Sequence, residues 1–114
     1  MLYEIRNAWY DPETFEEYIT WMREVAAAFY RSKADIVGFW AMNDMPPIIR
    51  GSQTHEYEMV PANFTWIVRW KDREHRDKVW NEVRRSEEYQ RFSSTRPGGM
   101  QRFFRIEIKF AEGL

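Results

Sequence analysis

The chain has 114 residues, a net charge of −1 at pH 7 and no cysteine. A balanced charge gives no general attraction to nucleic acid or to an anionic membrane. The lack of cysteine excludes disulfides, thiolate zinc sites and cysteine nucleophiles, and is typical of a reducing compartment. No apolar run approaches the roughly 20 residues of a membrane span, and the first residues enter a strand rather than a basic signal region. We therefore expect one cytoplasmic domain over residues 1–114, with no nucleic-acid or membrane partner.

Aromatic residues make up 18% of the chain and include six tryptophans. This is more aromatic surface than a small core usually needs. The surplus predicts an aromatic pocket, a subunit interface or both, although an aromatic-rich core is the simpler explanation.

The first half of the chain predicts a strand, a helix and a second strand. Residues 2–9 alternate between a mostly apolar set and a charged set, as a strand with two different faces does. Asp11 and Pro12 suit a helix start, and an apolar stripe at helical spacing runs from Phe15 to Phe29. Residues 35–42 are nearly all apolar, and Gly38 among them predicts a bulge.

The second half predicts two further strands separated by helices. Residues 43–62 lose periodicity and form a long connecting arm, which we expect to be partly extended around residues 53–59. Residues 63–70 alternate large apolar side chains with a mixed set, which is typical of a central strand. Asp72 and Ser86 then cap two helical segments, and residues 101–110 form the last strand.

This βαββαβ order predicts an α+β, ferredoxin-like fold, in which an antiparallel four-stranded sheet carries its helices on one face. The other face of the sheet is then open, and a second copy of the chain would cover it. From the alternation in each strand, we expect the following residues on that open face: Glu4, Arg6, Thr65, Ile67, Arg69, Phe103, Arg105 and Glu107.

Four short segments resemble the NIPSNAP-like branch of the dimeric α/β-barrel proteins. They are the opening residues 1–6, Gly38-Phe39-Trp40 in the second strand, the junction at residues 68–72 and the turn at residues 86–92. The resemblance covers nearly the whole chain except residues 43–62. It implies a homodimer in which two sheets face each other as a barrel, with the helices outside. It implies little about chemistry, because the superfamily contains cofactor-free monooxygenases, haem-degrading enzymes, small cyclases and proteins of unknown role.

The resemblance also allows a comparison with the haem-degrading members, which carry a first-strand asparagine, a third-strand tryptophan and a late histidine. Asn7 and Trp70 stand at matching places. The histidine is missing, because residues 89–92 read Tyr-Gln-Arg-Phe and His75 lies much earlier. Haem handling is therefore the weakest hypothesis, and we expect no cofactor.

Histidine chemistry has one further candidate in the arm. His55 stands beside Glu56 and Tyr57, and could act as a general base if the arm folds over a pocket; a solvated loop is the alternative. His75 suits a capping or packing role. Two isolated histidines without a carboxylate cluster do not predict a metal site.

Two functional hypotheses lead. The first is a homodimeric protein that binds a small aromatic or apolar ligand between sheet and helices, with at most a cofactor-free oxygenase-like or isomerase-like activity. The second is a structural or protein-interaction module without catalysis, whose aromatic surplus serves its interfaces. For the first hypothesis the expected ligand-binding residues are Tyr3, Asn7, Trp40, Trp66 and Trp70.

Overall fold

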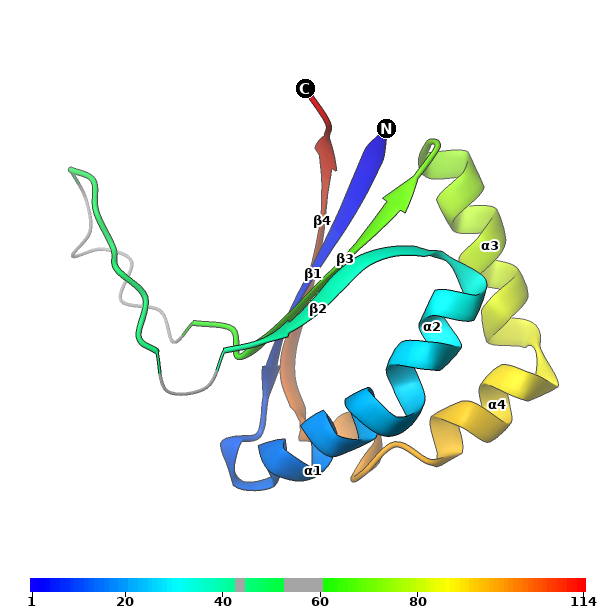
Figure 1. Cartoon of the computed structure of the whole chain (residues 1–114), viewed down its shortest axis with the longest axis horizontal. Helices are drawn as coiled ribbons and strands as arrows, with labels where there is room; N and C mark the ends of the chain where they lie inside the picture. The colour runs from blue at the N-terminus through cyan, green and yellow to red at the C-terminus, as the bar shows by residue number, and fades with distance from the viewer. Residues whose placement is uncertain (43–44, 53–60) are drawn as a thin grey trace.

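Four antiparallel strands form one sheet with the order β2-β3-β1-β4 (Figure 1). The structure is a computed structural model that describes residues 1–42, 45–52 and 61–114. The strands are β1 (Leu2–Tyr10), β2 (Asp35–Ala41), β3 (Phe64–Trp70) and β4 (Phe103–Glu112). Together with the helices between them they confirm the predicted ferredoxin-like fold.

The helices lie on one face of the sheet (Figure 1). Between β1 and β2 the chain forms the 3-10 turn η1 (Pro12–Thr14), α1 (Phe15–Trp21), the π-helical segment η2 (Met22–Ala26) and α2 (Ala27–Lys33). After β3 come α3 (Arg73–Arg85), α4 (Glu87–Ser94) and the 3-10 turn η4 (Gly99–Arg102). No helix within the described ranges is long and apolar enough to cross a membrane.

The predicted helix starts are confirmed by side-chain caps. The Asp11 carboxylate accepts a hydrogen bond from the Glu13 backbone N–H at 3.0 Å, which satisfies a donor that the first turn leaves free. Asp72 and Ser86 cap α3 and α4 in the same way. The predicted irregularity in β2 is also confirmed, because its pairing with β3 shifts register just before Gly38.

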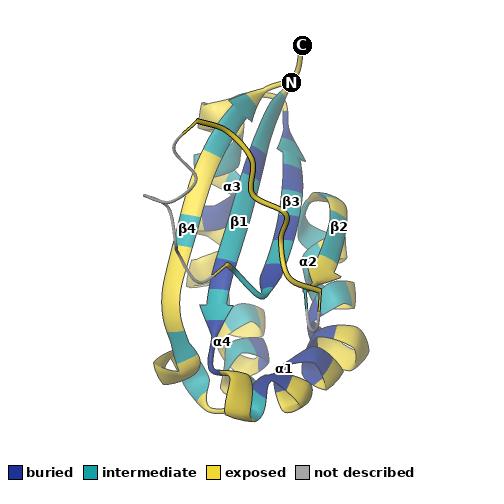
Figure 2. Cartoon of the chain, turned by 90° about the vertical axis from the view of Figure 1, so that its left-hand side faces the viewer, coloured by how far each residue is buried: buried dark blue, intermediate teal, exposed yellow. Residues whose placement is uncertain are grey.

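The helices cover the face of β1 that we expected to be open. Glu4 pairs in register with Val68 of β3, and neither residue has exposed surface. Because side chains alternate along a strand, Arg6 lies on the same covered side. The prediction that Glu4 and Arg6 lie on the open face is therefore wrong, and Ile5 and Asn7 lie there instead. Figure 2 shows this open face, with residues 45–52 passing in front of it.

The residues of β3 that we expected on the open face lie there, and so does Glu107 of β4. Thr65 and Arg69 of β3 lie on it, since the residues that alternate with them along the strand are buried against the helices. Ile67 shares this side of the strand. On β4, Glu107 also lies there, where it accepts a hydrogen bond from the Asn7 side chain at 3.2 Å.

The edge strand β4 contains one further correction. Its pairing with β1 shifts register between Trp9 and Tyr10. As a result Phe103 turns toward the helices, where its ring meets Tyr10 edge-on at 5.1 Å. The prediction that Phe103 lies on the open face is wrong, whereas Arg105 lies there as predicted, with its guanidinium 4.6 Å from the Trp9 ring.

The correction in β1 has a physical cause, which is the set of partners around the buried Glu4 carboxylate. Its Oε1 accepts hydrogen bonds from the indole N–H groups of Trp70 and Trp80, both at 2.9 Å. Its Oε2 pairs with Arg6 at 2.7 Å and with Arg76 at 2.9 Å. A buried carboxylate is tolerated only with such pairing. The two arginines and two indoles together tie β1 to β3 and α3.

The same partners keep Glu4 ionised. Burial alone raises the pKa of Glu4, but the hydrogen bonds from Arg76 and Trp80 and the charge of Arg6 outweigh burial and lower this pKa to about 2. Glu4 is therefore an anion across the physiological pH range, and Arg6 is held beside it.

We expect Glu4→Gln to lower the free energy of unfolding by about 3 to 5 kcal/mol, because the two arginines lose their buried counter-charge. Urea denaturation measures the change. Glu82→Gln is the matched control, since Glu82 is an exposed carboxylate on α3, and it should change stability by less than about 0.5 kcal/mol. Equal stabilities for the two variants would contradict the role given to Glu4.

The contribution of Glu4 should also depend on pH. Its folded-state pKa is depressed from 4.5 to about 2, so its stabilisation is complete above the unfolded pKa and is lost as the pH falls toward the folded pKa. Glutamine does not titrate. The difference in unfolding free energy between the wild-type protein and Glu4→Gln should therefore shrink in urea titrations between about pH 5 and about pH 2.5. A difference that stays constant over this range would exclude Glu4 as the titrating group.

Candidate functional site

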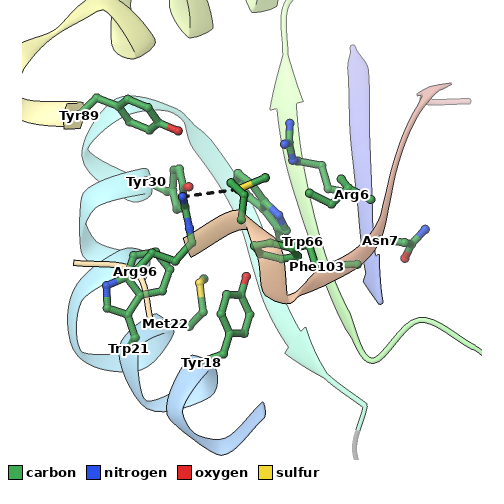
Figure 3. Close-up of a pocket in the computed structure, with 13 residues that line it drawn as sticks. Arg6, Asn7, Tyr18, Trp21, Met22, Tyr30, Trp66, Tyr89, Arg96 and Phe103 are labelled. Carbon is green, nitrogen blue, oxygen red and sulfur yellow. Dashed lines mark hydrogen bonds between the residues drawn. The ribbon is translucent and has the colours of Figure 1, made fainter. Parts of the chain in front are cut away.

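A cavity of about 110 Å³ lies between the sheet and the helices (Figure 3). Its walls come from β1, β3, the helix that follows β1, α4 and the chain leading into β4. Six of its thirteen lining residues are aromatic, and we call this space the aromatic cavity. The six rings that line it are Tyr18, Trp21, Tyr30, Trp66, Tyr89 and Phe103.

The first helix is irregular at this cavity. Its π-helical segment η2 (Met22–Ala26) inserts a wider turn between α1 and α2. Met22, the first residue of the segment, and Trp21 before it both line the cavity. Single π-helical turns inside α-helices are frequent at functional sites, because the wider turn displaces side chains from regular spacing. Here the irregular turn coincides with the cavity wall.

Tyrosine hydroxyls supply part of the polar surface of the cavity. Figure 3 shows the hydroxyls of Tyr18 and Tyr89 directed toward its interior. Burial raises the pKa of Tyr18 far above its ordinary value. Burial also raises the pKa of Tyr30, against the opposing effect of the neighbouring Arg96. Tyr18 and Tyr30 are therefore neutral at pH 7 and can donate a hydrogen bond to a bound molecule.

Two arginines supply the charge. The Arg6 guanidinium lies 4.8 Å from the Trp66 ring centre, and its Nη1 donates to Glu4 at 2.7 Å. The Arg6 Nε is buried and donates no hydrogen bond within the described part of the chain. Arg96 lies 5.3 Å from the Trp21 ring centre. The one hydrogen bond drawn from Arg96 in Figure 3 goes to the sulfur of Met100, at 3.7 Å, and this is a weak contact.

The mouth of the cavity is apolar. Met100 and Ile106 line it, and they are 56% and 39% exposed, respectively. Ile106 projects from β4, which the helices cover only in part. These two exposed side chains place the opening of the cavity at this edge of the sheet.

A second, larger hollow of about 1070 Å³ lies beside residues 45–47, the end of β1 and the start of α1. Trp9, Phe15 and Phe104 contribute to its apolar wall. It is a wide groove, open to solvent, and does not enclose a ligand. The aromatic cavity is the better candidate site because it lies between the sheet and the helices and carries several polar groups in its wall.

The expected ligand-binding residues are divided between the two faces of the sheet. Trp66 lines the aromatic cavity, as predicted. Trp70 lies on the same face but is 1% exposed and belongs to the core. Tyr3 pairs with Arg69 and Trp40 pairs with Thr65, so both lie on the open face.

Asn7 borders the cavity, yet Figure 3 shows its side chain directed away from it. The side chain donates to Glu107 and accepts from the Thr65 hydroxyl at 2.6 Å. Among the expected residues, only Trp66 therefore presents its side chain to the aromatic cavity.

The histidines do not form a site in the described structure. His55 lies outside the described residues. His75 is exposed on the first turn of α3, where its ring packs edge-on against Trp70 at 5.3 Å. Within the ranges that the structure describes, no three histidine, aspartate or glutamate side chains lie together as metal ligands would.

Sequence reasoning missed Arg6, Arg96 and the three cavity tyrosines. Tyr18 lies within the apolar stripe of the first helix, and Tyr89 lies in the helical segment that Ser86 caps. Arg96 stands in a segment rich in Ser, Pro and Gly, a composition that is typical of a turn. The signal that could have found it is an arginine in a loop following a helix whose inward face is aromatic.

The fold is shared with NIPSNAP proteins. An uncharacterized NIPSNAP domain protein from Burkholderia xenovorans superposes with a TM-score of 0.74 at 15% identity, over 100% of this chain and 95% of that chain. A NIPSNAP family protein from Agrobacterium tumefaciens gives 0.75 at 12% identity, over 99% and 85%. An antibiotic biosynthesis monooxygenase gives 0.56 at 15% identity, over 100% and 99%.

No protein-family model matches the sequence, and neither does any curated protein. The likeness to the solved structures therefore concerns the fold. At that level it confirms the resemblance inferred from the sequence: the chain has the ferredoxin-like fold of NIPSNAP proteins.

Proposed function

We propose that the protein binds a small aromatic or apolar molecule in the aromatic cavity. The observation that carries this proposal is a partly enclosed space lined by six aromatic rings and by hydrogen-bond donors, next to a π-helical turn. The cavity has about 110 Å³, and an apolar protein cavity of about 150 Å³ is known to take up benzene. The ligand should therefore be of the order of one ring.

Binding is favoured over catalysis by the chemistry of the wall. Within the described residues, no histidine, aspartate or glutamate lines the aromatic cavity. The raised pKa values of Tyr18 and Tyr30 make these groups poor bases at neutral pH. A cofactor-free oxygenase-like or isomerase-like reaction would need a base from outside this set; His55 is the residue to test for that role.

Haem does not fit this site. The macrocycle is several rings wide, whereas the cavity has about 110 Å³. Trp70, the residue compared with the haem-degrading enzymes, is packed against Trp80 at 5.2 Å and donates to Glu4. The packed rings of Trp70 and Trp80 leave no room for a flat cofactor between them.

An interaction module remains the second candidate function, because several apolar side chains of the chain are exposed. Met45 and Ile48 in the arm are 80% and 82% exposed, and Phe104 on β4 is 66% exposed. Such side chains are typical of a surface that meets another protein. A ligand titration followed by tryptophan fluorescence separates the two candidates.

We also propose that the protein is a homodimer formed through the open face of the sheet. This face carries Ile5, Ile67 and the half-exposed Trp40 among charged pairs. One of the pairs is Arg69 with Asp35, at 2.8 Å. A surface with both charges and apolar groups can complement its own copy across a two-fold axis. The NIPSNAP-like fold supports this arrangement, since the superfamily it resembles pairs its sheets in dimers.

For the ligand site, we expect at least one compound from a panel of phenols, quinones and short aromatic or aliphatic acids to quench tryptophan fluorescence saturably. Ile106→Phe should weaken that binding at least tenfold, because the larger ring fills the mouth of the cavity. Ile108→Phe is the matched control: it lies two residues further along the same face of β4, is equally exposed at 39%, and should leave affinity unchanged.

Two results would contradict the ligand site. One is a panel without any saturable quenching, which would favour the interaction module. The other is binding that Ile106→Phe leaves intact, since the ligand would then occupy another place on the protein.

For the dimer, Arg69→Glu should convert the protein to a monomer in sedimentation velocity experiments. The new carboxylate would face Asp35 inside the interface and repel it. Arg85→Glu makes the same charge change at an exposed position on α3, on the helix side of the sheet, and should leave the dimer intact. If Arg69→Glu sediments like the wild-type protein, the proposed interface is wrong.

A further inference from the structure

We infer that the ligand of the aromatic cavity is an anion: a single apolar ring or short chain that carries a carboxylate, which Arg6 and Arg96 bind. This inference rests on the proposed ligand site and specifies the chemistry of its occupant. Four observations lead to it: the charge of the wall, an unused donor of Arg6, the neutral tyrosines and the available volume.

The charge around the cavity is strongly positive. Arg6 and Arg96 line the aromatic cavity, and Arg84 lines a neighbouring hollow of about 40 Å³. The two spaces share four wall residues, namely Arg6, Tyr30, Trp66 and Tyr89. No carboxylate of the described chain lines either space, and none of the ion pairs in that part of the chain involves Arg84 or Arg96. Three cations therefore surround a space without an anion in its wall.

Arg6 has a negatively charged partner, but it shares this partner with a second arginine. The one carboxylate beside it, Glu4, also pairs with Arg76 at 2.9 Å. The Nη1 of Arg6 is used by Glu4, while its Nε is buried and has no acceptor within the described residues. A buried donor without an acceptor is rare in folded proteins. A carboxylate oxygen placed next to Arg6 would accept from it.

The hydroxyls around the arginines can support the same anion. Burial raises the pKa of Tyr18 and Tyr30, so both keep the proton that they would donate to a carboxylate oxygen. Tyr89 also directs its hydroxyl toward the interior (Figure 3). Hydrogen bonds from arginine to carboxylate are short and charge-assisted, and the flat guanidinium matches the two oxygens. A ring without a polar group would not accept from these donors.

Volume sets the size of the molecule. The aromatic cavity has about 110 Å³ and the neighbouring hollow about 40 Å³. Because benzene occupies a cavity of roughly 150 Å³, the two spaces together hold one ring, and the carboxylate of an acid such as benzoate would lie at the arginines in their walls. The rings of Tyr18, Trp21 and Trp66 enclose the apolar part, and the guanidinium groups meet the charged end.

The test compares benzoate with its neutral isostere benzamide at pH 7, using calorimetry or the tryptophan signal of the full chain. Both have one ring and nearly the same shape, and only benzoate carries a charge. We expect benzoate to bind at least tenfold more tightly. We also expect added salt to weaken benzoate binding more than benzamide binding, because the attraction is between charges.

Two variants locate the charge preference. Arg96→Gln should reduce the benzoate-to-benzamide affinity ratio at least fivefold, because the amide cannot offer a charged donor. Arg85→Gln is the matched control, with the same substitution at an exposed arginine that lines neither space; it should keep the wild-type ratio. Near-ultraviolet circular dichroism checks that both variants keep the aromatic packing.

The outcomes separate this inference from the ligand site itself. Benzamide binding as tightly as benzoate, with both lost in Ile106→Phe, would overturn the anion inference and leave the aromatic cavity as a site for neutral ligands. Binding of benzoate that survives Ile106→Phe would overturn it as well, because the acid would then sit on a surface arginine. If neither compound binds, the anion inference is overturned for ring acids of this size, and the ligand site then depends on the wider panel. The comparison in the wild-type protein decides the question even if Arg96→Gln fails to fold.

Discussion

The rest of the structure depends on one buried carboxylate. Glu4 has no exposed surface and meets donors from β1, β3 and α3. These contacts decide which face of β1 turns toward the helices, and thereby which residues reach the aromatic cavity. Arg6 is the link between the two roles, because it pairs with Glu4 and also stacks on Trp66 in the cavity wall. The packing of the core and the chemistry of the site are therefore not independent.

Much of the fold could be predicted because its signals are local. Caps such as Asp11 and Asp72, the alternation in β3 and the irregularity at Gly38 each depend on a few neighbouring residues. The face of β1 could not be predicted in this way. Periodicity treats a glutamate as exposed, and the indole and guanidinium partners that reverse this expectation lie 66 to 76 residues further along the chain. The error at Glu4 and Arg6 follows from this distance.

The candidate site was predictable only in its position and its aromatic character. Trp66 faces the cavity because β3 has a clear dry face. Tyr3 and Trp40 were assigned to the pocket with it, but strand pairing places them on the opposite side of the sheet. The π-helical turn after Trp21 has no sequence signature of its own. Arg96 reaches the cavity from an irregular segment, whose path depends on packing rather than on periodicity.

Charge balance connects the fold with the proposed occupant. In the free protein, the single charge of Glu4 is shared by Arg6 and Arg76, and Arg76 has a further partner in the half-exposed Asp77 at 3.0 Å. Arg6 has no such second partner in the described structure. An anion in the aromatic cavity would supply it and complete the pairing around Glu4. Ligand and core would then stabilise each other through the same guanidinium, whereas the open face of the sheet, on the far side of β1, would be free to serve the dimer.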